Sequence, residues 1–493
     1  MSRPRVHLDR VAWAVLACTV LALITGLAIK SHCTGAPFDA LGRSDGFAAT
    51  PGRICYSDIQ FLWVGRDINQ HVFPYIHGWI DSQGHLQGGA IEYPVLSGLL
   101  YWLGAIGAHN DQQYLWQMSL ILTPFGLLTG WVLAKLSGRT ALLWALAPPL
   151  AMYAFHNVEL PVVAAATCAV AVMERARRRG TAPRGPALAA AALLAIGFDL
   201  KLYPGIFVVP LALYVLTYGT RDDSGRRIGR FDVRGALSVV GVGAVVAIAP
   251  NVPFMLLGYD GWRASLTFQE LRTADLSTNS IWYWGVQHAF SSAHAYDAFV
   301  KIASPAAIVV AFVMILVLGW RRYLRIGGYP WIGVSAALLS AFVLLHKVHS
   351  PQYILWLLPF FVLLRIDWRL VAAYLVCDLS LELTVWSYFQ EHADHTPVSW
   401  WVQWGVWIGV WGRAALLAVF LFYLPGRAVR RRPPGPDGDY EAGAGSDPRD
   451  GSDGTSDPDD ASGAPSSTPP WGSSSGGEYG PGNVARTRSS SGR

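Results

Sequence analysis

Residues 11–29 read VAWAVLACTVLALITGLAI, an uninterrupted apolar run long enough to cross a lipid bilayer as a helix. Arg3, Arg5 and Arg10 precede this run and no convincing small-residue cleavage site follows it, so we expect an uncleaved signal-anchor helix. Similar apolar runs recur along the chain as far as residue 424. The sequence therefore predicts an all-α integral membrane protein.

The composition agrees with this fold class. Hydrophobic residues make up 52% of the 493 residues and charged residues only 14%, whereas about a quarter of the residues of a soluble protein are charged. The net charge of +5 does not indicate a nucleic-acid partner, because the basic residues are spread through short loops. In a membrane protein such residues report orientation instead.

About twelve transmembrane helices are predicted. Their ranges are 11–29, 112–134, 140–155, 158–174, 186–199, 202–219, 235–250, 301–319, 330–345, 354–364, 369–386 and 401–424. Residues 93–107 are also apolar, but about 15 residues rising ~1.5 Å each are too short for a bilayer core of about 30 Å. We expect this segment to lie in the interface as an extracytoplasmic juxtamembrane helix.

The basic residues decide the orientation. If residues 93–107 do not cross the membrane, the arginine-rich turns at 175–179, 221–234 and 321–325 all face the cytoplasm, as the positive-inside rule requires. Both termini are then cytoplasmic. The extracytoplasmic segments become 30–111, 156–157, 200–201, 251–300, 346–353 and 387–400.

This topology divides the chain into three parts. A cytoplasmic N-terminus (1–10) precedes a transmembrane catalytic domain (11–425), and a cytoplasmic tail (426–493) follows it. The first extracytoplasmic loop is 30–111 and the second large one is 251–300, whose aromatic residues suit helices at the headgroup level. The tail is rich in Gly, Ser, Pro and Asp and cannot bury a core, so we expect it to be disordered.

Most of the unusual polar residues fall on the extracytoplasmic side. They are Asp58, Glu92, His156, Glu159, Lys201, Arg272, Lys347 and His349. Ionisable residues at membrane depth are costly and usually functional. Their gathering on one face predicts a single extracytoplasmic site.

Asp58, in the stretch Cys55-Tyr56-Ser57-Asp58-Ile59, is the candidate catalytic residue. A hydroxyl that attacks a sugar needs a carboxylate within hydrogen-bond reach to take its proton. One base without a second carboxylate as nucleophile gives a single displacement, with inversion at the anomeric carbon. Ser57-Asp58 is also a reasonable helix N-cap, so both interpretations are open.

Three basic residues are candidates for binding a donor phosphate: Lys347, Arg272 and Lys201. A departing phosphate needs cations where negative charge grows, and the planar guanidinium of Arg272 can grip two oxygens. The alternative for Lys201 is snorkelling to the interface, paired with Asp199.

Five further residues are candidates for the substrate pocket. His349, Gln352 and Tyr353 offer hydrogen bonds to a substrate, although a plain polar turn is the alternative. Glu92 and Tyr93 either shape the sugar pocket or form the start of a helix.

Cys33 and Cys55 lie in the same extracytoplasmic loop, where a disulfide would tie the base of the segment that carries Asp58. Two unrelated thiols are the alternative. The other three cysteines fall within apolar spans and are expected to be inert. His346 and His349 lack further ligands nearby, so we expect hydrogen-bonded structure and no metal site.

No nucleotide-phosphate loop or zinc-spaced Cys/His cluster is present in the sequence. An extracytoplasmic site has no ready supply of nucleotide sugars or ATP. We therefore expect a membrane-borne activated donor and no cofactor.

Four motifs in order resemble glycosyltransferase family 87. They are Cys-Tyr-Ser-Asp-Ile at 55–59, Glu-Tyr-Pro-Val-Leu at 92–96, Lys-Leu-Tyr-Pro at 201–204, and Lys-Val-His-Ser-Pro-Gln-Tyr at 347–353 followed by Trp356 and Pro359. The resemblance covers roughly residues 10–425, and the last motif is the most specific. The family consists of GT-C membrane enzymes that include polyprenyl-phosphate-mannose-dependent α-mannosyltransferases of actinobacterial envelopes.

The resemblance implies a GT-C fold, a first-loop aspartate as catalytic base (here Asp58), a polyprenyl-phosphate sugar donor, and no nucleotide or obligatory metal. Tyr56, Asn157 and Glu159 join the expected substrate pocket. The chain departs from the family where Asn157-Val158-Glu159 replaces Asn-Trp-Asp, and where His346 replaces Asn before Lys-Val. Both places lie near the expected site, so the sugar and the acceptor stay open.

We therefore expect a cell-membrane glycosyltransferase that moves a hexose, most readily mannose, from a polyprenyl phosphate to an extracytoplasmic glycolipid or polysaccharide. A polyprenyl-phosphate-arabinose-dependent arabinosyltransferase is one alternative, because nothing in the sequence separates pentose from hexose. A transporter of lipid-linked glycans is another. Transporters place polar residues near the midplane in paired halves, whereas here they gather on one face and no second half mirrors the first.

Overall fold

The computed structural model describes residues 9–48, 53–222, 224 and 226–431. Most of the expected N-terminus (1–10) and tail (426–493) therefore lies outside the described residues. The described part is mostly helical, with one short antiparallel hairpin of β1 (Trp79–Ile80) and β2 (Leu86–Gln87). The predicted all-α membrane fold class is confirmed.

Five stretches of the described chain are long and apolar enough to cross a membrane. They are α1 (Arg10–Ser31), α5 (Asp111–Ser137) continued by η2 (Gly138–Ala141) and α6 (Leu142–Leu146), α15 (Ala293–Ile326), α18 (Trp368–Ala393), and α19 (Trp400–Tyr423) continued by η7 (Leu424–Gly426). The protein is thus a multi-pass membrane protein, while the count of twelve spans is not confirmed.

Shorter helices occupy the remaining predicted spans. They are α7 (Pro148–Tyr153), α8 (Glu159–Arg178), α9 (Arg184–Leu200), η3 (Tyr203–Phe207) with α10 (Val208–Thr217), α11 (Val233–Ile248), α16 (Trp331–Leu345), and η6 (Pro351–Tyr353) with α17 (Ile354–Leu363). The extramembrane segments carry α2 (Asp45–Ala48), α3 (Asp58–Gly65), η1 (Ile68–Gln70), α4 (Val95–Gly104), α12 (Val252–Leu257), α13 (Tyr259–Leu271), η4 (Leu276–Thr278), α14 (Ile281–Trp284) and η5 (Val286–Ala289).

The predicted span 140–155 is wrong as one continuous helix. α6 ends at Leu146, Ala147 has extended backbone angles, and α7 starts again at Pro148. A proline lacks the N–H of the helical hydrogen-bond ladder and drives the residue before it out of the helical region. The break redirects the chain toward the turn at residues 154–158, which enters the candidate site.

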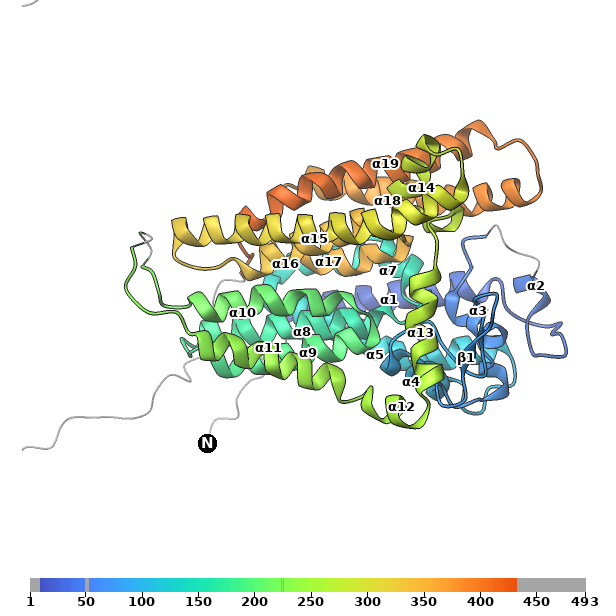
Figure 1. Cartoon of the computed structure of the whole chain (residues 1–493), viewed down its shortest axis with the longest axis horizontal. Coiled ribbons are helices and arrows are strands. Elements are labelled where there is room, and N and C mark those ends of the chain that lie inside the picture. The colour runs from blue at the N-terminus through green and yellow to red at the C-terminus, as the bar shows by residue number, and fades with distance from the viewer. Residues whose placement is uncertain (1–8, 49–52, 223, 225, 432–493) are drawn as a thin grey trace, which may run out of the picture. The chain divides into compact units, whose positions relative to one another are not determined.

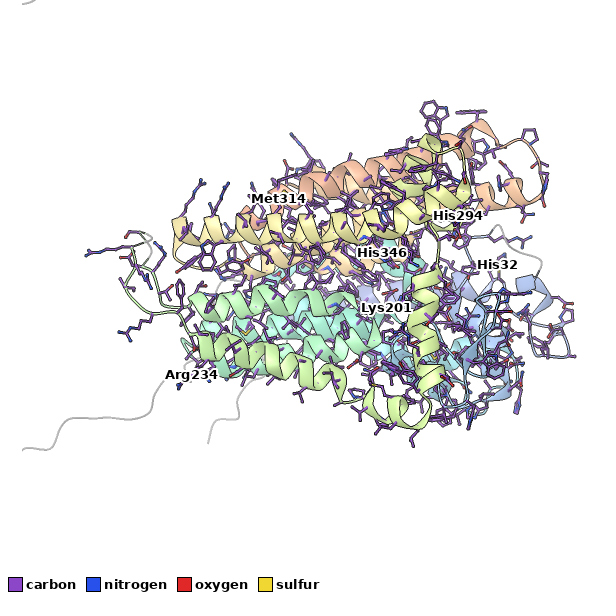
Figure 2. All side chains as sticks on the ribbon, in the orientation of Figure 1. His32, Lys201, Arg234, His294, Met314 and His346 are labelled. Atoms are coloured by element: carbon purple, nitrogen blue, oxygen red, sulfur yellow. A yellow bond between two sulfur atoms is a disulfide. The ribbon has the colours of Figure 1, made fainter. Side chains whose placement is uncertain are left out.

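The connections between the long helices gather at two ends of the bundle (Figure 1). One end, here called the α3 end, holds α2, α3, the β1–β2 hairpin, α12 and α13. The turn between α10 and α11 lies at the opposite end, here called the arginine end. Figure 2 shows Lys201 and His346 toward the α3 end and Arg234 at the arginine end.

The apolar segment 93–107 forms the short helix α4 at the α3 end (Figure 1). Its N-cap is Pro94, and its 10 residues at ~1.5 Å each fall well short of a bilayer core. The hydroxyl of Ser97 donates to the backbone carbonyl of Leu200, at 2.6 Å. This bond fixes the start of α4 beside the end of α9, where Lys201 follows.

Burial separates the inner helices from the outer ones. Every residue of α17 is buried, as are most residues of α16. In contrast, α1, α11 and α15 expose large apolar side chains, such as Leu21 (64% exposed), Leu237 (66%) and Ile302 (73%). Apolar faces of this extent are expected where helices contact lipid.

Candidate functional site

The start of α3 is bound to the turn between α7 and α8. Ser57 is the N-cap residue, but its hydroxyl donates to the carbonyl of Phe155 at 2.7 Å and makes no cap bond. The backbone N–H of Asp58 donates to the carbonyl of His156 at 2.9 Å. Asp58 is the first residue of α3 rather than its N-cap, so its carboxylate is left for other contacts.

The carboxylate of Asp58 is surrounded by polar side chains that belong to three separate parts of the chain. Its Oδ2 accepts a hydrogen bond from Nδ2 of Asn157 at 2.7 Å and lies 3.5 Å from Nε2 of Gln352. Nε2 of His156 is 3.7 Å away, and the hydroxyl of Tyr56 also bonds the carboxylate. The side chain remains 22% exposed, so one approach stays open.

Asp58 is held in its ionised form. Burial raises the pKa of this group, but His156, the Asn157 amide and Lys201 hold it below its ordinary value of 3.8. Burial also lowers the pKa of His156 to about 3, which makes that imidazole neutral at pH 7. The amide and Lys201 therefore sustain the lowering, and Asp58 is a carboxylate able to accept a proton.

Asn157 is locked in one orientation. Its Nδ2 donates to Asp58 and to the hydroxyl of Tyr93, both at 2.7 Å. Its Oδ1 accepts from the hydroxyl of Tyr101 and from the backbone N–H of Val158, both also at 2.7 Å. Because both amide protons and both lone pairs are used, the amide cannot turn without losing several bonds. Asn157 thus aims the Asp58 carboxylate.

Glu159 forms a closed ion pair with Lys201. Its carboxylate accepts from the Lys201 ammonium and from the indole N–H of Trp356. The two charged side chains are 0% and 9% exposed, so Lys201 does not snorkel to solvent. The alternative interpretation, in which Lys201 pairs with Asp199, is wrong, because Asp199 instead accepts from Asn251 at 3.0 Å. The local sequence suggested the nearer acid, but the fold brings Glu159 closer.

Glu92 pairs with Arg66, a residue that the sequence analysis did not single out. The guanidinium grips both carboxylate oxygens, at 2.6 and 3.1 Å, and both side chains are almost buried. Nε2 of Gln269 on α13 donates to the backbone carbonyl of Glu92 at 2.7 Å. Because α4 begins only at Val95, Glu92 does not form the first turn of that helix. It joins α3, α4 and α13.

Arg272 and Lys347 form a pair of neighbouring cations. Arg272 follows the last residue of α13, and Nζ of Lys347 donates to the backbone carbonyl of Glu270 at 3.2 Å. Burial and the neighbouring Arg272 lower the pKa of Lys347. Arg272 also acts electrostatically on Tyr56 and Tyr93. Neither cation forms an ion pair with a carboxylate of the described residues, so both remain available to an anion.

Within the predicted string 347–353, one side chain, that of Gln352, contacts the Asp58 carboxylate. Gln352 faces Asp58, while burial lowers the pKa of His349 and keeps its imidazole neutral. Tyr353 stacks on Trp356 with ring centroids 3.9 Å apart, and Trp356 stacks on Tyr203 at 4.3 Å. The string therefore supplies one polar contact to Asp58 and an aromatic wall beside Glu159 and Lys201.

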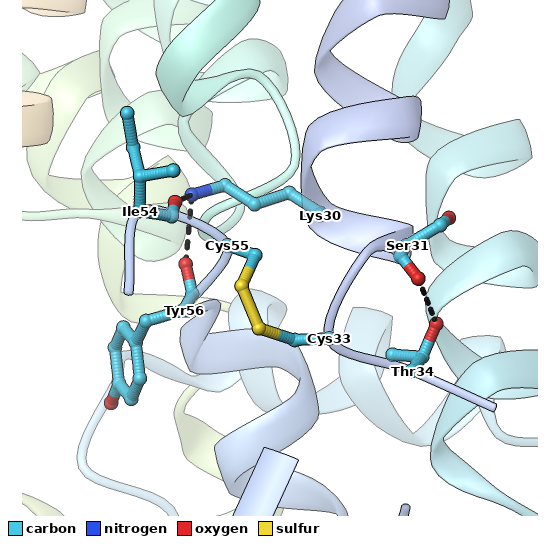
Figure 3. The surroundings of a disulfide bond; sticks show 7 residues. All are labelled: Lys30, Ser31, Cys33, Thr34, Ile54, Cys55 and Tyr56. Carbon is cyan, nitrogen blue, oxygen red and sulfur yellow. Dashed lines mark hydrogen bonds between the residues drawn. A yellow bond between two sulfur atoms is a disulfide. The ribbon is translucent and has the colours of Figure 1, made fainter. Parts of the chain in front are cut away.

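The segment that precedes Asp58 is tied at its base (Figure 3). Cys33 and Cys55 form a disulfide with their Cα atoms 5.7 Å apart. The ammonium of Lys30 donates to the backbone carbonyls of Ile54 at 2.9 Å and Tyr56 at 2.8 Å. These contacts restrict the backbone two residues before Asp58.

A second polar group lies behind the site and was missed. Arg413 pairs with Asp378 at 3.2 Å, with both side chains 1% exposed, and Glu382 is buried one turn further along α18. Trp386, on the same helix, packs against Tyr56 with tilted rings whose centroids are 4.9 Å apart. The signal was present in the sequence, because charged residues inside predicted spans are usually functional.

An apolar cavity of about 430 Å³ lies among helices that lead to Tyr93, Glu159 and Lys201. Its walls come from α4, α5, α8 and α9 and consist of carbon-rich side chains. Leu96, Pro161 and Leu200 line it, each within three positions of Tyr93, Glu159 or Lys201 in the sequence. A lipid-sized apolar space thus adjoins the polar site.

Comparison with solved structures gives weak likenesses to oligosaccharyltransferases, and comparison with curated proteins adds none. Two solved structures from Archaeoglobus fulgidus resemble this chain weakly: an oligosaccharyltransferase in the apo form (12% identity, TM-score 0.32, covering 83% of this chain and 56% of that one) and the oligosaccharyltransferase AglB in complex with an inhibitory peptide and a dolichol-phosphate (10%, 0.32, 84% and 56%). This chain spans just over half the length of those chains, and both likenesses are too weak to show a shared function. Comparison with curated proteins gives no match.

The family comparison is more informative. Residues 157–392 match the model of the family described as Mannosyltransferase (PIG-M). The matched region begins at Asn157 and contains Glu159, Lys201, Arg272 and Lys347, while Asp58 lies outside it. The match does not single out glycosyltransferase family 87, and that resemblance stays a prediction. Over this region the chain is similar to membrane mannosyltransferases, which supports a membrane glycosyltransferase.

Proposed function

We propose that this protein is a GT-C membrane glycosyltransferase that transfers mannose from a polyprenyl phosphate to a hydroxyl of an extracytoplasmic glycolipid or polysaccharide. The observation that carries the proposal is the ionised, partly exposed carboxylate of Asp58, aimed by a locked amide. The match to a mannosyltransferase family favours mannose as the sugar.

The proposed reaction is a single displacement. Asp58 takes the proton of the acceptor hydroxyl while that oxygen attacks the anomeric carbon of the donor. The bond between the anomeric carbon and the phosphate oxygen breaks, and the polyprenyl phosphate leaves with the electron pair. A single attack from the opposite face inverts the anomeric configuration.

Arg272 and Lys347 are the proposed phosphate ligands. They lie close enough for Arg272 to lower the pKa of Lys347, and a phosphate between them would offset that repulsion. Fixed cations also stabilise the charge that grows on the leaving phosphate. Lys201 is bound to Glu159 and supplies a positive potential that keeps Asp58 ionised.

The apolar cavity beside Lys201 supports a lipid-borne donor. It is large enough, at about 430 Å³, to hold several isoprenoid units with their carbon atoms out of water. Tyr56, Tyr93 and Gln352 surround Asp58 and form the proposed sugar side of the pocket. Because the donor arrives activated, the proposed reaction needs no further cofactor.

The test is transfer by the purified full-length chain. Radiolabelled polyprenyl-phosphate mannose and a glycolipid acceptor extract should give labelled product with inverted configuration by NMR. The same assay with polyprenyl-phosphate arabinose tests the pentose alternative, and chelation of divalent metals should leave the rate unchanged. Folded protein that transfers neither sugar would contradict the proposal.

The phosphate assignment has its own test. Arg272→Gln and Lys347→Gln should each lower kcat/KM for the donor about tenfold or more, as expected for loss of a charge-assisted contact. Arg263→Gln is the matched control, since Arg263 lies on α13 with its side chain 48% exposed. Equal losses in all three variants would show a general effect of charge and reject the assignment.

A further inference from the structure

A second cavity, of about 650 Å³, lies at the arginine end of the bundle. Its walls come from the end of α5, the turn before α18, and the segment that follows α19. Arg365, Arg427, Arg430 and Arg431 line it, with Asp367 as the one lining carboxylate. The cavity is therefore strongly cationic, and it shares no residue with the Asp58 site.

Two of the four guanidinium groups, those of Arg427 and Arg430, are held in place by contacts within the protein. The strand-like bridge between Leu364 and Val429 brings the two wall segments together. Arg430 donates from Nε to the carbonyl of Leu364 at 2.9 Å and from Nη2 to that of Ile366 at 3.2 Å. The guanidinium of Arg427 stacks on the ring of Tyr423, 3.8 Å from its centroid. Arginines fixed in this way form a site at little cost in side-chain entropy.

The positive charge of this cavity is not matched by the described residues. Arg431 pairs with Glu174 at 3.1 Å, whereas Arg365, Arg427 and Arg430 form no ion pair with a described carboxylate. Asp367 uses an oxygen to accept the backbone N–H of Arg369 at the start of α18. The excess charge calls for an anion with several oxygens, which the guanidinium fork matches.

A buried hydroxyl adds an independent indication of a ligand. Ser137 lines the cavity and is only 9% exposed, yet its Oγ has no hydrogen-bond partner in the described part of the chain. Buried polar groups are usually satisfied. The Oγ itself is shielded from solvent, so a ligand oxygen in the cavity would satisfy it once the serine side chain rotates toward the cavity.

The place of the cavity indicates the source of the anion. It lies where α18 begins and α19 ends, and both helices are long enough to cross the bilayer. The neighbouring side chains of Trp368 and Phe422 are 72% and 61% exposed, as expected for aromatic residues at the membrane interface. We propose that this cavity binds the phosphate headgroup of an anionic phospholipid. The proposal is independent of the reaction assigned to Asp58.

The experiment measures thermal stabilisation of the full-length chain by added lipid. Phosphatidylglycerol titrated into phosphatidylcholine nanodiscs should raise Tm and saturate, while inorganic phosphate should not reproduce the effect. The double variant Arg365→Gln/Arg427→Gln should need about 25-fold more phosphatidylglycerol, at roughly fivefold per arginine. The matched control Arg234→Gln/Arg321→Gln removes the same charge from two exposed arginines outside the cavity. It measures the diffuse contribution of surface charge, and the cavity double variant should shift the midpoint further.

Three results would overturn the proposal. Equal midpoints for the wild type and the cavity double variant would mean that the cavity arginines do not bind the lipid. Equal losses in both double variants would mean a diffuse charge effect. Stabilisation by inorganic phosphate as strong as by phosphatidylglycerol would mean a soluble phosphate ligand. If the cavity double variant does not fold in phosphatidylcholine, Ser137→Ala replaces it; a shift of about threefold is expected, and no shift counts against the site.

Discussion

The starts of α3 and α8 each place a carboxylate in the same part of the molecule. One carboxylate is buried in an ion pair and the other is partly exposed. Glu159 is the first residue of α8, is 0% exposed, and is neutralised by Lys201 and Trp356. Asp58 is the first residue of α3, stays 22% exposed, and is contacted by an amide and other uncharged groups, while Lys201 acts on it electrostatically without a direct ion pair. Asn157, two residues before Glu159, links the two helix starts through its hydrogen bond to the Asp58 carboxylate.

The difference separates a structural acid from a chemical one. A carboxylate paired with an ammonium in a buried site leaves little room for a substrate. A carboxylate bound by neutral donors at a partly exposed site keeps access and can receive a proton. Under the proposed function, proton transfer belongs to Asp58 and Glu159 serves as the ion-pair partner of Lys201. Four changes test the contrast.

The largest expected effect is that of Asp58→Asn. An amide has the same shape but cannot accept the acceptor proton, so transfer should fall about 10²- to 10⁴-fold. Donor binding and Tm should stay close to those of the wild type, measured on the purified variant. Turnover near the wild-type rate would remove the base assignment and with it the contrast between the two acids.

Glu159→Gln should act on stability instead. It leaves the ammonium of Lys201 buried without a charge partner, which costs about 3–5 kcal/mol of unfolding free energy. Denaturant unfolding should show the loss, and adding Lys201→Met should recover part of it. A variant of normal stability with no activity would place Glu159 in the chemistry.

Cys55→Ser tests the fixed base of the α3 segment. The cysteines are 22 residues apart, and opening a loop of that size costs about 3 kcal/mol. Cys33→Ser should give the same loss, and the double variant no more than either single one. Cys18→Ala, at a free cysteine in α1, serves as the control. Losses that add in the double variant would argue against a shared bond.

Asn157→Ala gives the smallest of the four effects and the clearest pH signature. Loss of a hydrogen bond to a charged group costs about 1.5–3 kcal/mol, and the pKa of Asp58 should rise. The rate falls as pH drops through this pKa, so the acid limb of the pH profile should move to higher pH in the variant. An unchanged acid limb would mean that the amide does not hold the carboxylate ionised.

The same pKa sets the sign of the effect of pH on stability. In the wild type the folded-state pKa of Asp58 lies below its ordinary value of 3.8. The ionised group therefore stabilises the fold above its unfolded pKa, and this contribution is lost as pH falls through the folded pKa. The Asn157→Ala substitution reduces the difference between the folded-state and unfolded-state pKa of Asp58, and with it this contribution to stability.

The helices were predictable because length and apolarity are local properties of the sequence. The break at Pro148 was visible in the sequence as Pro148-Pro149, but an average of hydropathy across 140–155 conceals it. The number of crossings was not predictable, because α17 is apolar and wholly buried by protein. Hydropathy does not distinguish a helix surrounded by helices from one surrounded by lipid.

The gathering of the site was partly predictable. Sidedness placed Asp58 at the expected site, the polar string at 347–353 offered Gln352, and the family resemblance added Asn157. The structure places Asn157 and Gln352 beside the Asp58 carboxylate. The choice of partner was not predictable: Glu92 takes Arg66, and Lys201 takes Glu159 rather than Asp199. Such pairings depend on how distant segments pack, and spacing along the chain does not encode that.

The link between Cys33 and Cys55 has a consequence for the biogenesis of the protein. Cytosolic reductants keep thiols reduced, while disulfides form where the environment is oxidising. On the predicted topology, the backbone before Asp58 would acquire its final restraint only after the first loop has been exported. In a newly made chain the position of Asp58 would thus stay less restrained until the first loop reached the oxidising compartment. Formation of the disulfide would then be a step in maturation of the proposed enzyme.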